Sequence, residues 1–309
     1  MKIGAICSNN LPSVATIGFF DGVHRGHRHL IDQVCAEARK RGWASAVITF
    51  PVHPRKVIQP EFCPKLLTTY EEKVELLSAT AVDYCLTLDF TPYLAALSAH
   101  DFMEVLKNRY NIRALLIGYD HRFGHNRSEG FEDYVAYGRE LGMDVIPAGP
   151  CLREGERAVS SSAVRRLLEA GEVEQAASLL GYEYFLSGKV VEGHQVGRKL
   201  GFPTANLQVG DVDKLVPADG VYAVRVEVQG TCYGGMLSIG YRPTLNNGTD
   251  RSIEVHIFHF NADIYHCPMR IFFVRRLRAE LKFDSLEELT ERLRQDKVEA
   301  EKVLNEYNR

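Results

Sequence analysis

The sequence predicts an α/β protein of two domains: a parallel sheet with helices on both faces, then an antiparallel β domain that ends in a helix. Over residues 14–180, short apolar β-branched runs alternate with helical segments, as they do in parallel sheets covered by helices. From about residue 182 the hydrophobic period changes from 3.6 to 2, which is typical of antiparallel strands. A chain of 309 residues also has the length of two average domains.

The first predicted strand leads into a glycine-rich turn. Residues 14–17 are a short apolar run typical of a buried strand, and apolar residues recur at helical spacing over residues 30–42. Free N–H groups and the positive end of a helix dipole attract phosphate, and glycines let it approach closely. His24 and His27 are three residues apart, so they lie on one face of the first helical turn. We favour a phosphate site over a surface loop with incidental histidines, because His-x-Gly-His directly follows a strand.

The later elements of the first domain follow in alternation. Strands are predicted at residues 44–50, 82–90, 113–118 and 144–147, and helices begin at the capping residues Thr69 (with Glu72) and Ser98 and cover residues 131–141 and 173–180. Ligands of parallel sheets bind at the C-terminal edge of the strands. The histidine turn and the loop that follows Gly118 both lie at this edge.

Two further polar segments extend the predicted site. The loop at residues 118–127 is basic and rich in histidine, and a solvated loop is the plain alternative. Residues 160–162 are three serines that precede a helix carrying Arg165. Such serines are helix caps at the least. Their hydroxyls, the helix N–H groups and an arginine fork can also hold phosphate oxygens.

The second domain reads as a series of hairpins. Residues 222–228 alternate, turn at residues 229–230 and resume at Tyr233. Residues 253–257 alternate again and are followed by a turn at residues 261–263. They are predicted to pair with a strand from Met269 to Val274. Successive hairpins make an antiparallel sheet or a small barrel.

The chain is predicted to end in an amphipathic helix. Asp284 and Glu287 form a capping box in the sequence. The apolar stripe of this helix consists of Leu286, Leu289, Leu293 and Ala300. We place the domain boundary where the hydrophobic period changes, with residues 1–183 in the first domain and residues 184–309 in the second.

Composition narrows the class of protein. Hydrophobic residues make up 45% and charged residues 25%, with a net charge of −3, which argues against a nucleic-acid or anionic-membrane partner. The seven cysteines are scattered without a Cys-x-x-Cys pair, a pattern that speaks against a disulfide framework or a zinc site. The sequence shows neither a signal region nor an apolar run of membrane-span length. We therefore expect a cytoplasmic protein and leave its oligomeric state open.

The first domain resembles a known family. Its turn is similar to the His-x-Gly-His signature of nucleotidylyltransferases, and the string Gly-Phe-Phe-Asp-Gly-Val-His-Arg-Gly-His resembles the first motif of bifunctional bacterial riboflavin kinase/FAD synthetases. The loop after Gly118 resembles a Gly-x-Asp-Phe-x-Phe-Gly motif, with His121 where an aromatic residue is usual. The serine segment resembles Ser-Ser-Thr-x-x-Arg, with Ser162 in the threonine position. The resemblance implies a Rossmann-like nucleotidylyltransferase domain.

The second domain resembles riboflavin kinase. The strings that carry this resemblance are Pro-Thr-Ala-Asn (residues 203–206), Gly-Val-Tyr (220–222), Ile-Gly-Tyr-Arg-Pro-Thr (239–244) and Glu-Val-His-Ile (254–257). Ser238 stands where the family often has asparagine. The resemblance spans nearly the whole chain in the family's order and implies a kinase barrel.

The family resemblance implies two reactions. The second domain would phosphorylate riboflavin to FMN with ATP, and the first would transfer AMP from ATP to FMN, which yields FAD and pyrophosphate. Mg²⁺ is the implied cofactor, and the implied partners are riboflavin, FMN, FAD and ATP. Adenylyl transfer needs no base, because the phosphate of FMN is already anionic, whereas phosphorylation of a hydroxyl needs one.

The resemblance also implies residue roles. The implied catalytic residues are His24, His27 and Arg165 for adenylyl transfer and Glu254 as the base of the kinase, with Thr204 and Asn206 as Mg²⁺ ligands. The implied ATP- and phosphate-binding residues are Gly18, Phe19, Phe20, Asp21, Gly22, Gly26, Ser161, Ser162, Gly188, Gly193, Gly197 and Gly201. The implied flavin-binding residues are Asp120, Arg122, Arg242 and Arg278. Without the resemblance, Glu254 would be interpreted as an outward-facing strand carboxylate.

Two other hypotheses stay open at this point. One is a nucleotidylyltransferase for another phosphate acceptor, with the barrel merely fused to it; the Pro-Thr-Ala-Asn and Glu-Val-His-Ile strings argue against it. The other is a flavin-binding or flavin-sensing module without turnover. The presence of both His24 and Glu254 argues against this second hypothesis.

Overall fold

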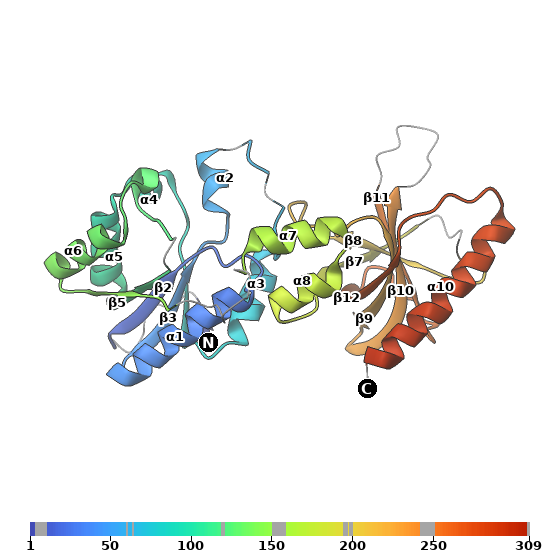
Figure 1. Ribbon diagram of the computed structural model, residues 1–309, viewed down its shortest axis with the longest axis horizontal. Coiled ribbons are helices and arrows are strands. Elements are labelled where there is room, and N and C mark those ends of the chain that lie inside the picture. Colours follow the sequence, from blue (N-terminus) through green and yellow to red (C-terminus); the bar gives the residue numbers. More distant parts are fainter. Residues whose placement is uncertain are drawn as a thin grey trace. The chain divides into compact units, whose positions relative to one another are not determined.

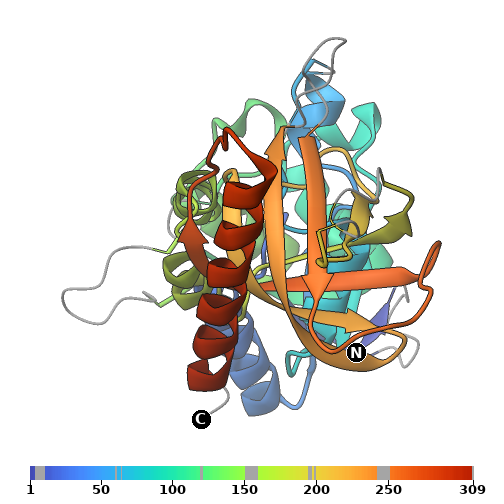
Figure 2. The same cartoon turned by 90° about the vertical axis from the view of Figure 1, so that its right-hand side faces the viewer.

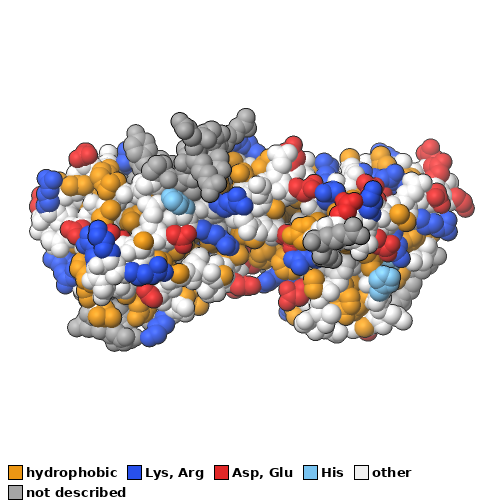
Figure 3. Space-filling model, turned by 60° about the horizontal axis from the view of Figure 1, so that its bottom comes forward, with side chains coloured by type: hydrophobic (Ala, Val, Ile, Leu, Met, Phe, Trp, Pro, Cys, Tyr) orange, Lys and Arg blue, Asp and Glu red, His pale blue; other side chains and the backbone are white. Residues whose placement is uncertain are grey.

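The computed structural model describes residues 1–3, 11–59, 61–63, 65–118, 121–149, 159–193, 197, 200–241 and 251–307. The chain divides into two compact units, Met1–Ser161 and Ser162–Arg309. The first unit contains a six-stranded parallel sheet and the second a closed six-stranded antiparallel barrel (Figure 1). Both architectures confirm the predicted fold class. On the face drawn in Figure 3, acidic and basic side chains are interspersed.

The parallel sheet places β2 near its centre. In spatial order its strands are β1 (Lys2–Ile3), β4 (Tyr84–Thr87), β3 (Ala44–Thr49), β2 (Ser13–Ile17), β5 (Ile112–Ile117) and β6 (Asp144–Pro147). The helices are α1 (Arg25–Arg41), α2 (Pro54–Ile58), α3 (Tyr70–Ser78), α4 (Pro92–Ala96), α5 (Ala99–Tyr110) and α6 (Phe131–Leu141), with the short 3-10 helix η1 (His125–Arg127). β3 and β4 follow β2 toward one edge of the sheet, whereas β5 and β6 lie on the other side of β2. The direction in which successive strands are added therefore reverses between β2 and β5. Ligands of open α/β sheets bind at such a point.

The sheet is buried on both faces because successive side chains of a strand point in opposite directions. Ala15 belongs to the apolar cluster that contains Phe102 of α5 and Tyr134 of α6. Its neighbour Val14 belongs to a second cluster with Val34 of α1. Burying a side chain such as Val34 contributes about 1.5–3 kcal/mol, and this two-sided burial explains why the strands read as unbroken apolar runs.

Local signals in the sequence set the helix ends. α1 ends at Gly42, whose φ of 68° is the left-handed conformation that favours glycine. The predicted capping box of α3 is confirmed, since Thr69 accepts from Glu72 N–H and the Glu72 side chain accepts from Thr69 N–H. Ser98 caps α5 by accepting from the Asp101 N–H.

The second unit is a barrel preceded by two helices and followed by one. Around the barrel the strands are β10 (Thr231–Tyr241), β11 (Arg251–Ile257), β8 (Ala205–Val209), β7 (Phe185–Val191), β12 (Pro268–Arg278) and β9 (Gly220–Val228). The helices are α7 (Ser161–Ala170), α8 (Val173–Leu180) and α10 (Leu286–Tyr307). The predicted β9–β10 hairpin is confirmed, and its turn residues Gln229 and Gly230 have φ values of 51° and 75°, as a tight two-residue hairpin requires.

One predicted hairpin is wrong. β11 does not pair with β12 in the described part of the chain: β11 lies between β10 and β8, and β12 lies between β7 and β9. Closing the barrel requires β12 to join the edges of β7 and β9, which removes the unpaired edges of an open sheet. Alternation in sequence identifies both strands but does not name their partners.

The final helix lies along the outside of the barrel (Figure 2). Ala300, Val303 and Leu304 pack in one cluster with barrel residues such as Val221. The start of the helix corrects the sequence prediction, because Ser285 rather than Asp284 caps it by accepting from Glu288 N–H at 3.2 Å. The predicted apolar stripe is also shorter than expected, since Leu286 is 60% exposed at the free end of the helix.

The two helices before the barrel belong to the second compact unit. Ala218 N–H donates to the Leu168 carbonyl of α7 at 3.0 Å. Arg275 Nε of β12 donates to Glu174 of α8 at 2.9 Å. The sequence-based boundary at residues 183/184 therefore lies after these helices, whereas the compact units part at Ser161/Ser162. Helical periodicity alone does not reveal that α7 and α8 bond to downstream strands.

Candidate active sites

The turn between β2 and α1 is braced by Asp21. The Asp21 carboxylate accepts from Leu67 N–H at 2.9 Å and from Thr68 N–H at 3.1 Å, and Asp21 is only 4% exposed. Gly22 N–H donates to Thr68 Oγ1 at 3.1 Å. The resemblance placed Asp21 and Gly22 among phosphate-binding residues, but these bonds tie both of them to the segment before α3. The carboxylate is thereby directed into the protein.

The backbone of this turn is strained. Phe20 and Val23 have φ values of 54° and 35°, which L-residues rarely adopt. Both side chains are nearly or fully buried in the cluster that also contains Ile31 of α1. Core burial thus offsets the strain, a pattern found at functional sites. Phe20 shapes the turn from the core, and its ring meets the His27 ring edge-on at 5.2 Å.

His24 and His27 form a stacked pair. Their ring centroids are 3.6 Å apart and the planes differ by 14°. His24 caps α1, since its Nδ1 accepts from His27 N–H at 3.3 Å. Burial, His24 and Lys73 hold the pKa of His27 well below its usual range. The His27 ring is therefore neutral near pH 7, and the His24 ring is neutral when its Nδ1 accepts this hydrogen bond.

Small residues let the next segment approach this pair. A Cβ on Gly26 would lie 3.2 Å from the His24 ring and 3.4 Å from the Val159 carbonyl. Ser161 Oγ donates to the Asp21 carbonyl at 2.9 Å. The structure thus brings Ser161, the second serine of the motif, to the histidine turn. Ser162 is exposed and Arg165 half-buried on α7, both in the second compact unit.

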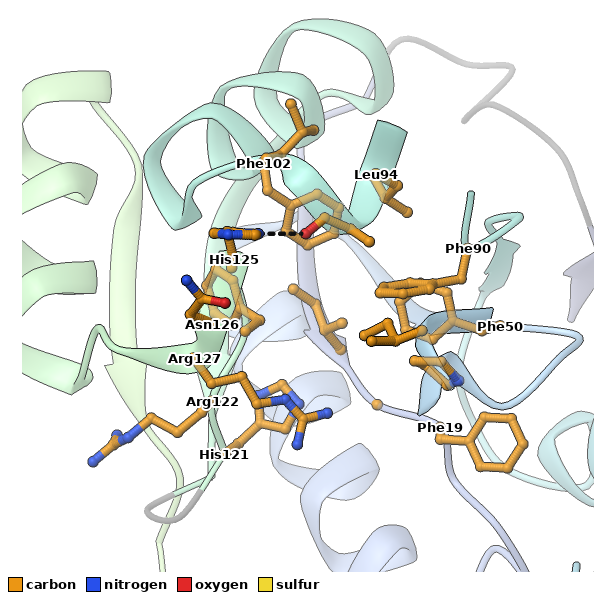
Figure 4. A pocket seen from close by; sticks show the side chains of 18 of the residues that line it. Phe19, Phe50, Phe90, Leu94, Phe102, His121, Arg122, His125, Asn126 and Arg127 are labelled. Carbon is orange, nitrogen blue, oxygen red and sulfur yellow. Dashed lines mark hydrogen bonds between the residues drawn. The ribbon is translucent and has the colours of Figure 1, made fainter. Parts of the chain in front are cut away.

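A cavity of about 450 Å³ opens beside the turn. Figure 4 shows its apolar wall, which includes Phe19, Phe50 and Phe90. The polar side chains opposite are those of His121, Arg122, His125, Asn126 and Arg127. Gly18 and Ile17, at the end of β2, also line the cavity. Its place between the ends of β2 and β5 is the strand-order reversal of the sheet, and its aromatic lining suits a flat, largely apolar ring.

The loop after β5 completes this pocket. Of the two residues predicted to bind flavin in this loop, Arg122 lines the cavity, whereas Asp120 lies outside the described residues. Gly124 has a φ of 89°, and a Cβ there would lie 2.7 Å from the Ala99 N atom. Only glycine lets this loop pass so close to the start of α5. His125 Nδ1 lies 3.2 Å from the Ala95 carbonyl, which ties the loop to the end of α4.

A second constellation forms between β8 and β11. Asn206 and Glu254 are directly paired across the two strands, so their side chains share one face of the barrel wall. Thr204 Oγ1, immediately before β8, donates to Glu254 Oε2 at 3.2 Å. The structure therefore brings together the three residues predicted for the kinase base and the metal. A further cavity of about 380 Å³ adjoins Thr204, and Phe260 and Tyr265 line it.

His256 supports this constellation from the same strand. Its Nδ1 lies 2.9 Å from the Pro203 carbonyl, and since a carbonyl only accepts, Nδ1 carries the proton. The ring meets those of Phe202 and Phe258 edge-on. Burial lowers the pKa of His256, so the neutral ring holds the peptide from which Thr204 projects.

The oxygen atoms gathered around Glu254 are of a kind that could hold Mg²⁺. Among the described residues no cluster of three or more His, Cys, Asp or Glu side chains could hold a metal. Thr204, Asn206 and Glu254 instead offer a hydroxyl, an amide and a carboxylate oxygen at one place, and Mg²⁺ takes such hard oxygen ligands together with substrate phosphates.

The predicted glycines of the kinase segment have close-packing roles. A Cβ would lie 2.1 Å from the Gln208 carbonyl oxygen at Gly188, 2.1 Å from the Asn206 amide at Gly193 and 2.4 Å from the Phe202 carbonyl oxygen at Gly197. Gly201 has a φ of 84°. At Gly193, two residues after β7, the lack of a side chain lets the backbone lie directly against the predicted ligand Asn206.

The remaining flavin predictions fall elsewhere. Arg242 lies outside the described residues. The Arg278 guanidinium is bound by Asp296 of α10, with Nη2 at 2.6 Å from Oδ2, so its described side-chain ion pair joins the barrel to the final helix.

Sequence reasoning missed several residues of these sites. Lys73 reads as a surface lysine of an amphipathic helix, yet it is 2% exposed beneath the pocket. The aromatic wall was missed because Phe50, Phe90 and Phe102 are far apart in the chain. His256 could have been found, since it lies in the Glu-Val-His-Ile string.

Comparisons with known proteins cover both units. The FAD synthetase family model matches residues 7–163 and the riboflavin kinase model matches residues 180–304. A bifunctional riboflavin kinase/FMN adenylyltransferase of Bacillus subtilis (strain 168) is 35% identical over 294 residues, which cover 93% of this chain and 91% of the relative. Its counterpart in Escherichia coli (strain K12) is 36% identical over 289 residues, with 93% and 91% covered.

A solved structure is similar over the same extent. It is a crystal structure from Streptococcus pneumoniae titled a macrolide-efflux protein, with a TM-score of 0.84, 33% identity and 93% of each chain covered. In the part of this chain that the structure describes, none of the helices has the length and apolar character needed to span a membrane.

Proposed function

Because the chain belongs to the family of bifunctional riboflavin kinases/FMN adenylyltransferases, we propose that its two units hold two active sites. In this proposal the histidine turn and its pocket transfer AMP from ATP to FMN, giving FAD and pyrophosphate. The site around Glu254 phosphorylates riboflavin with ATP, giving FMN and ADP. The product of the second unit is thus a substrate of the first.

The pocket beside the histidine turn is the observation that carries the proposal. Its volume of about 450 Å³ is in the range of small-molecule sites. The aromatic wall of Phe19, Phe50 and Phe90 offers a surface for a flat isoalloxazine ring, and Arg122 offers donors to its polar edge. A flavin ring held there has its phosphate tail free to reach the adjoining turn.

Adenylyl transfer needs positioning and charge stabilisation. A phosphate oxygen of FMN attacks the α-phosphorus of ATP, a P–O bond forms, and the bond to the pyrophosphate leaving group breaks. His24 accepts through Nδ1, so its neutral ring carries its proton on Nε2 and donates from there. Donors preorganised toward the developing charge lower the barrier. On the strength of the motif resemblance, Ser161, Ser162 and Arg165 contribute further phosphate contacts.

Riboflavin phosphorylation is assigned to the second unit. Glu254 accepts the proton of the ribityl 5′-hydroxyl as that oxygen attacks the γ-phosphorus of ATP, and ADP leaves. Thr204 and Asn206 would hold Mg²⁺, which neutralises phosphate charge when bound. The cavity next to Thr204, lined by Phe260 and Tyr265, is placed to take the nucleotide. Arg122 is our proposed flavin contact in the first unit, and roles for Arg242 and Arg278 rest on resemblance alone.

Product analysis tests the proposal. The full chain is incubated with riboflavin, ATP and Mg²⁺, and flavins are separated chromatographically. FMN that appears first and FAD that follows are expected. FMN without FAD would overturn the assignment of the first unit, and FAD formed only from added FMN would overturn that of the second.

We also propose a reducing cytoplasm as the compartment of the protein, since Cys35, Cys63, Cys85, Cys232 and Cys267 are free thiols.

A further inference from the structure

A lysine is buried beneath the pocket of the first unit. Lys73 lies on α3 and is 2% exposed, although lysine is almost never fully buried without a partner. Burying an ammonium ion is costly unless other groups stabilise it. None of the roles assigned above accounts for this charge.

The contacts of Lys73 lead to two residues of the pocket wall. Its Nζ donates to the Phe50 carbonyl at 2.7 Å. The same atom lies 3.9 Å from the centroid of the Phe19 ring, well within the range of a cation–π contact. Phe19 follows β2 and Phe50 follows β3, and both line the cavity. A single ammonium group therefore joins the ends of two neighbouring strands under the pocket.

The Phe19 backbone is held at the same junction. Its carbonyl accepts from Thr49 Oγ1 at 3.2 Å, and its ring meets that of His53 edge-on at 4.6 Å. The backbone of Phe19 is thus fixed by β3, whereas its ring is held between His53 and the Lys73 ammonium. If the ammonium is removed, the Phe19 ring loses the cation–π contact that helps to fix its orientation.

Charged and titratable groups face Lys73 from three elements. Asp21 in the turn and Cys85 on β4 favour its charged form, and His27 on α1 interacts with it as a like charge. Tyr70 on α3 itself lies 5.8 Å away, measured from Nζ to the ring centroid. Burial outweighs the effects of Asp21 and Cys85 and lowers the pKa of Lys73 to about 8. The ammonium therefore loses its proton in mildly alkaline solution.

We propose that Lys73 is a positioning residue for the flavin nucleotide, whose ammonium fixes the Phe19 ring and the Phe50 carbonyl and so sets the affinity of the first unit for FMN. This inference rests on the proposed function of that pocket. Lys73 does not touch the ligand, because it lies beneath the two wall residues. Its removal acts on FMN binding through Phe19 and Phe50.

The first test compares two substitutions in the full chain. Lys73→Met keeps the length of the side chain but removes the charge and the donor. We expect the KM for FMN in FAD formation to rise about tenfold, the effect of losing a charge-assisted hydrogen bond. The KM for ATP and riboflavin phosphorylation stay at parental values. Lys107→Met is the matched control, because Lys107 also donates to a main-chain carbonyl, that of Leu141, but does not line the cavity.

The second test uses the pH dependence of the parental protein, so it does not depend on a variant that folds. Between about pH 7 and 9.5 the KM for FMN should rise as Lys73 deprotonates, and in Lys73→Met this rise should disappear. A parental FMN affinity that is flat over this range, or a Lys73→Met protein with parental KM and pH profile, overturns the inference. Absence of FAD formation in the parental chain would instead overturn the proposed function.

Discussion

At the scale of single residues, ring stacking limits the positive charge that the histidine turn can carry. His24 and His27 lie 3.6 Å apart, so a proton on one ring opposes a proton on the other. A proton on His24 Nδ1 would also break the helix cap that this atom accepts from His27 N–H. In the proposed site, the pair would therefore donate hydrogen bonds to phosphate from neutral rings. Permanent charge must come from arginine or from a bound cation.

Replacing His27 should separate the two activities. We expect His27→Ala to lower the rate of FAD formation from FMN by about 10²–10³, the usual effect of losing one preorganised donor. Riboflavin phosphorylation should stay near normal, because that site lies on the barrel. Steady-state assays with FMN or riboflavin as the starting flavin measure the two rates. Equal losses of both activities in a folded variant would contradict the assignment of two sites.

The opposite separation is expected at Glu254. Glu254→Gln keeps the size of the side chain and still accepts from Thr204 through its amide oxygen, but it removes the basicity. FMN formation should fall by about 10²–10⁴, while adenylylation of added FMN stays at the parental rate. Glu192→Gln, an exposed carboxylate near the same site, is the control. A parental kinase rate in Glu254→Gln would mean that another group is the base.

At this scale, residue types were predicted better than residue orientations. The spacing of the histidines placed them on one helical face, and the kinase strings named Thr204 and Glu254, which the structure brings within 3.2 Å. The inward direction of Asp21 could not be predicted, because its partners Leu67 and Thr68 come from a distant segment. Lys73 was missed for the same reason.

At the scale of elements, α10 is attached to the barrel by a buried charge cluster. Asp296 is fully buried. Its carboxylate contacts Arg278 of β12 and lies 2.9 Å from Arg292 Nε of its own helix. Apolar contacts by Ala300, Val303 and Leu304 continue the attachment. This ion pair fixes the rotation of α10 about its axis, because Asp296 reaches Arg278 only when its face of the helix lies against the barrel.

Removing this carboxylate should be strongly destabilising. Asp296→Ala leaves two guanidinium groups without their partner, and we expect the free energy of unfolding of the second unit to fall by about 3–5 kcal/mol. Glu291→Ala is the control, because Glu291 is exposed and pairs with exposed Arg294 on the same helix, so that its loss should change stability by less than about 1 kcal/mol. Denaturant titration followed by circular dichroism measures both. Equal effects of the two substitutions would show that the Asp296 cluster contributes no more than a surface pair.

Helix caps and turns, whose residues are close together in the sequence, were predicted well. Pairings between strands that are far apart in the sequence were not. The Thr69–Glu72 capping box and the Gln229–Gly230 turn are complete within a few residues. The partners of β12 are set by barrel closure, which short-range alternation does not encode. The cap of α10 shifted by one residue, because Asp284 and Ser285 are both good capping residues and only the geometry decides between them.

At the scale of the whole molecule, the order of the strands explains where the first site lies. The reversal between β2 and β5 brings the ends of these strands to one crevice, and the histidine turn and the loop after Gly118 follow them. The sequence indicated that both segments share an edge of the sheet. It did not reveal the cavity, because the phenylalanines that line it come from separate segments, after β2, after β3 and on α5.

The division of the chain yields a prediction about fragments. Residues 184–309 contain the whole barrel, α10 and the kinase strings, and should fold alone and produce FMN, since about 125 residues is within the usual size of a domain. The fragment Ser162–Arg309 keeps in addition the bond of α8 to the barrel through Glu174 and Arg275, and the bond of Glu183, which follows α8, with Arg225.

The longer fragment should therefore melt at a temperature about 10 °C higher than the shorter one, because each net hydrogen bond adds about 1 kcal/mol and each kcal/mol raises the melting temperature of a small domain by several degrees. Thermal unfolding followed by circular dichroism, together with an FMN assay on both fragments, measures this. Equal melting temperatures would mean that α7 and α8 add no stability to the barrel. Cooperative melting of both fragments without FMN formation would mean that residues before Ser162 complete the kinase site.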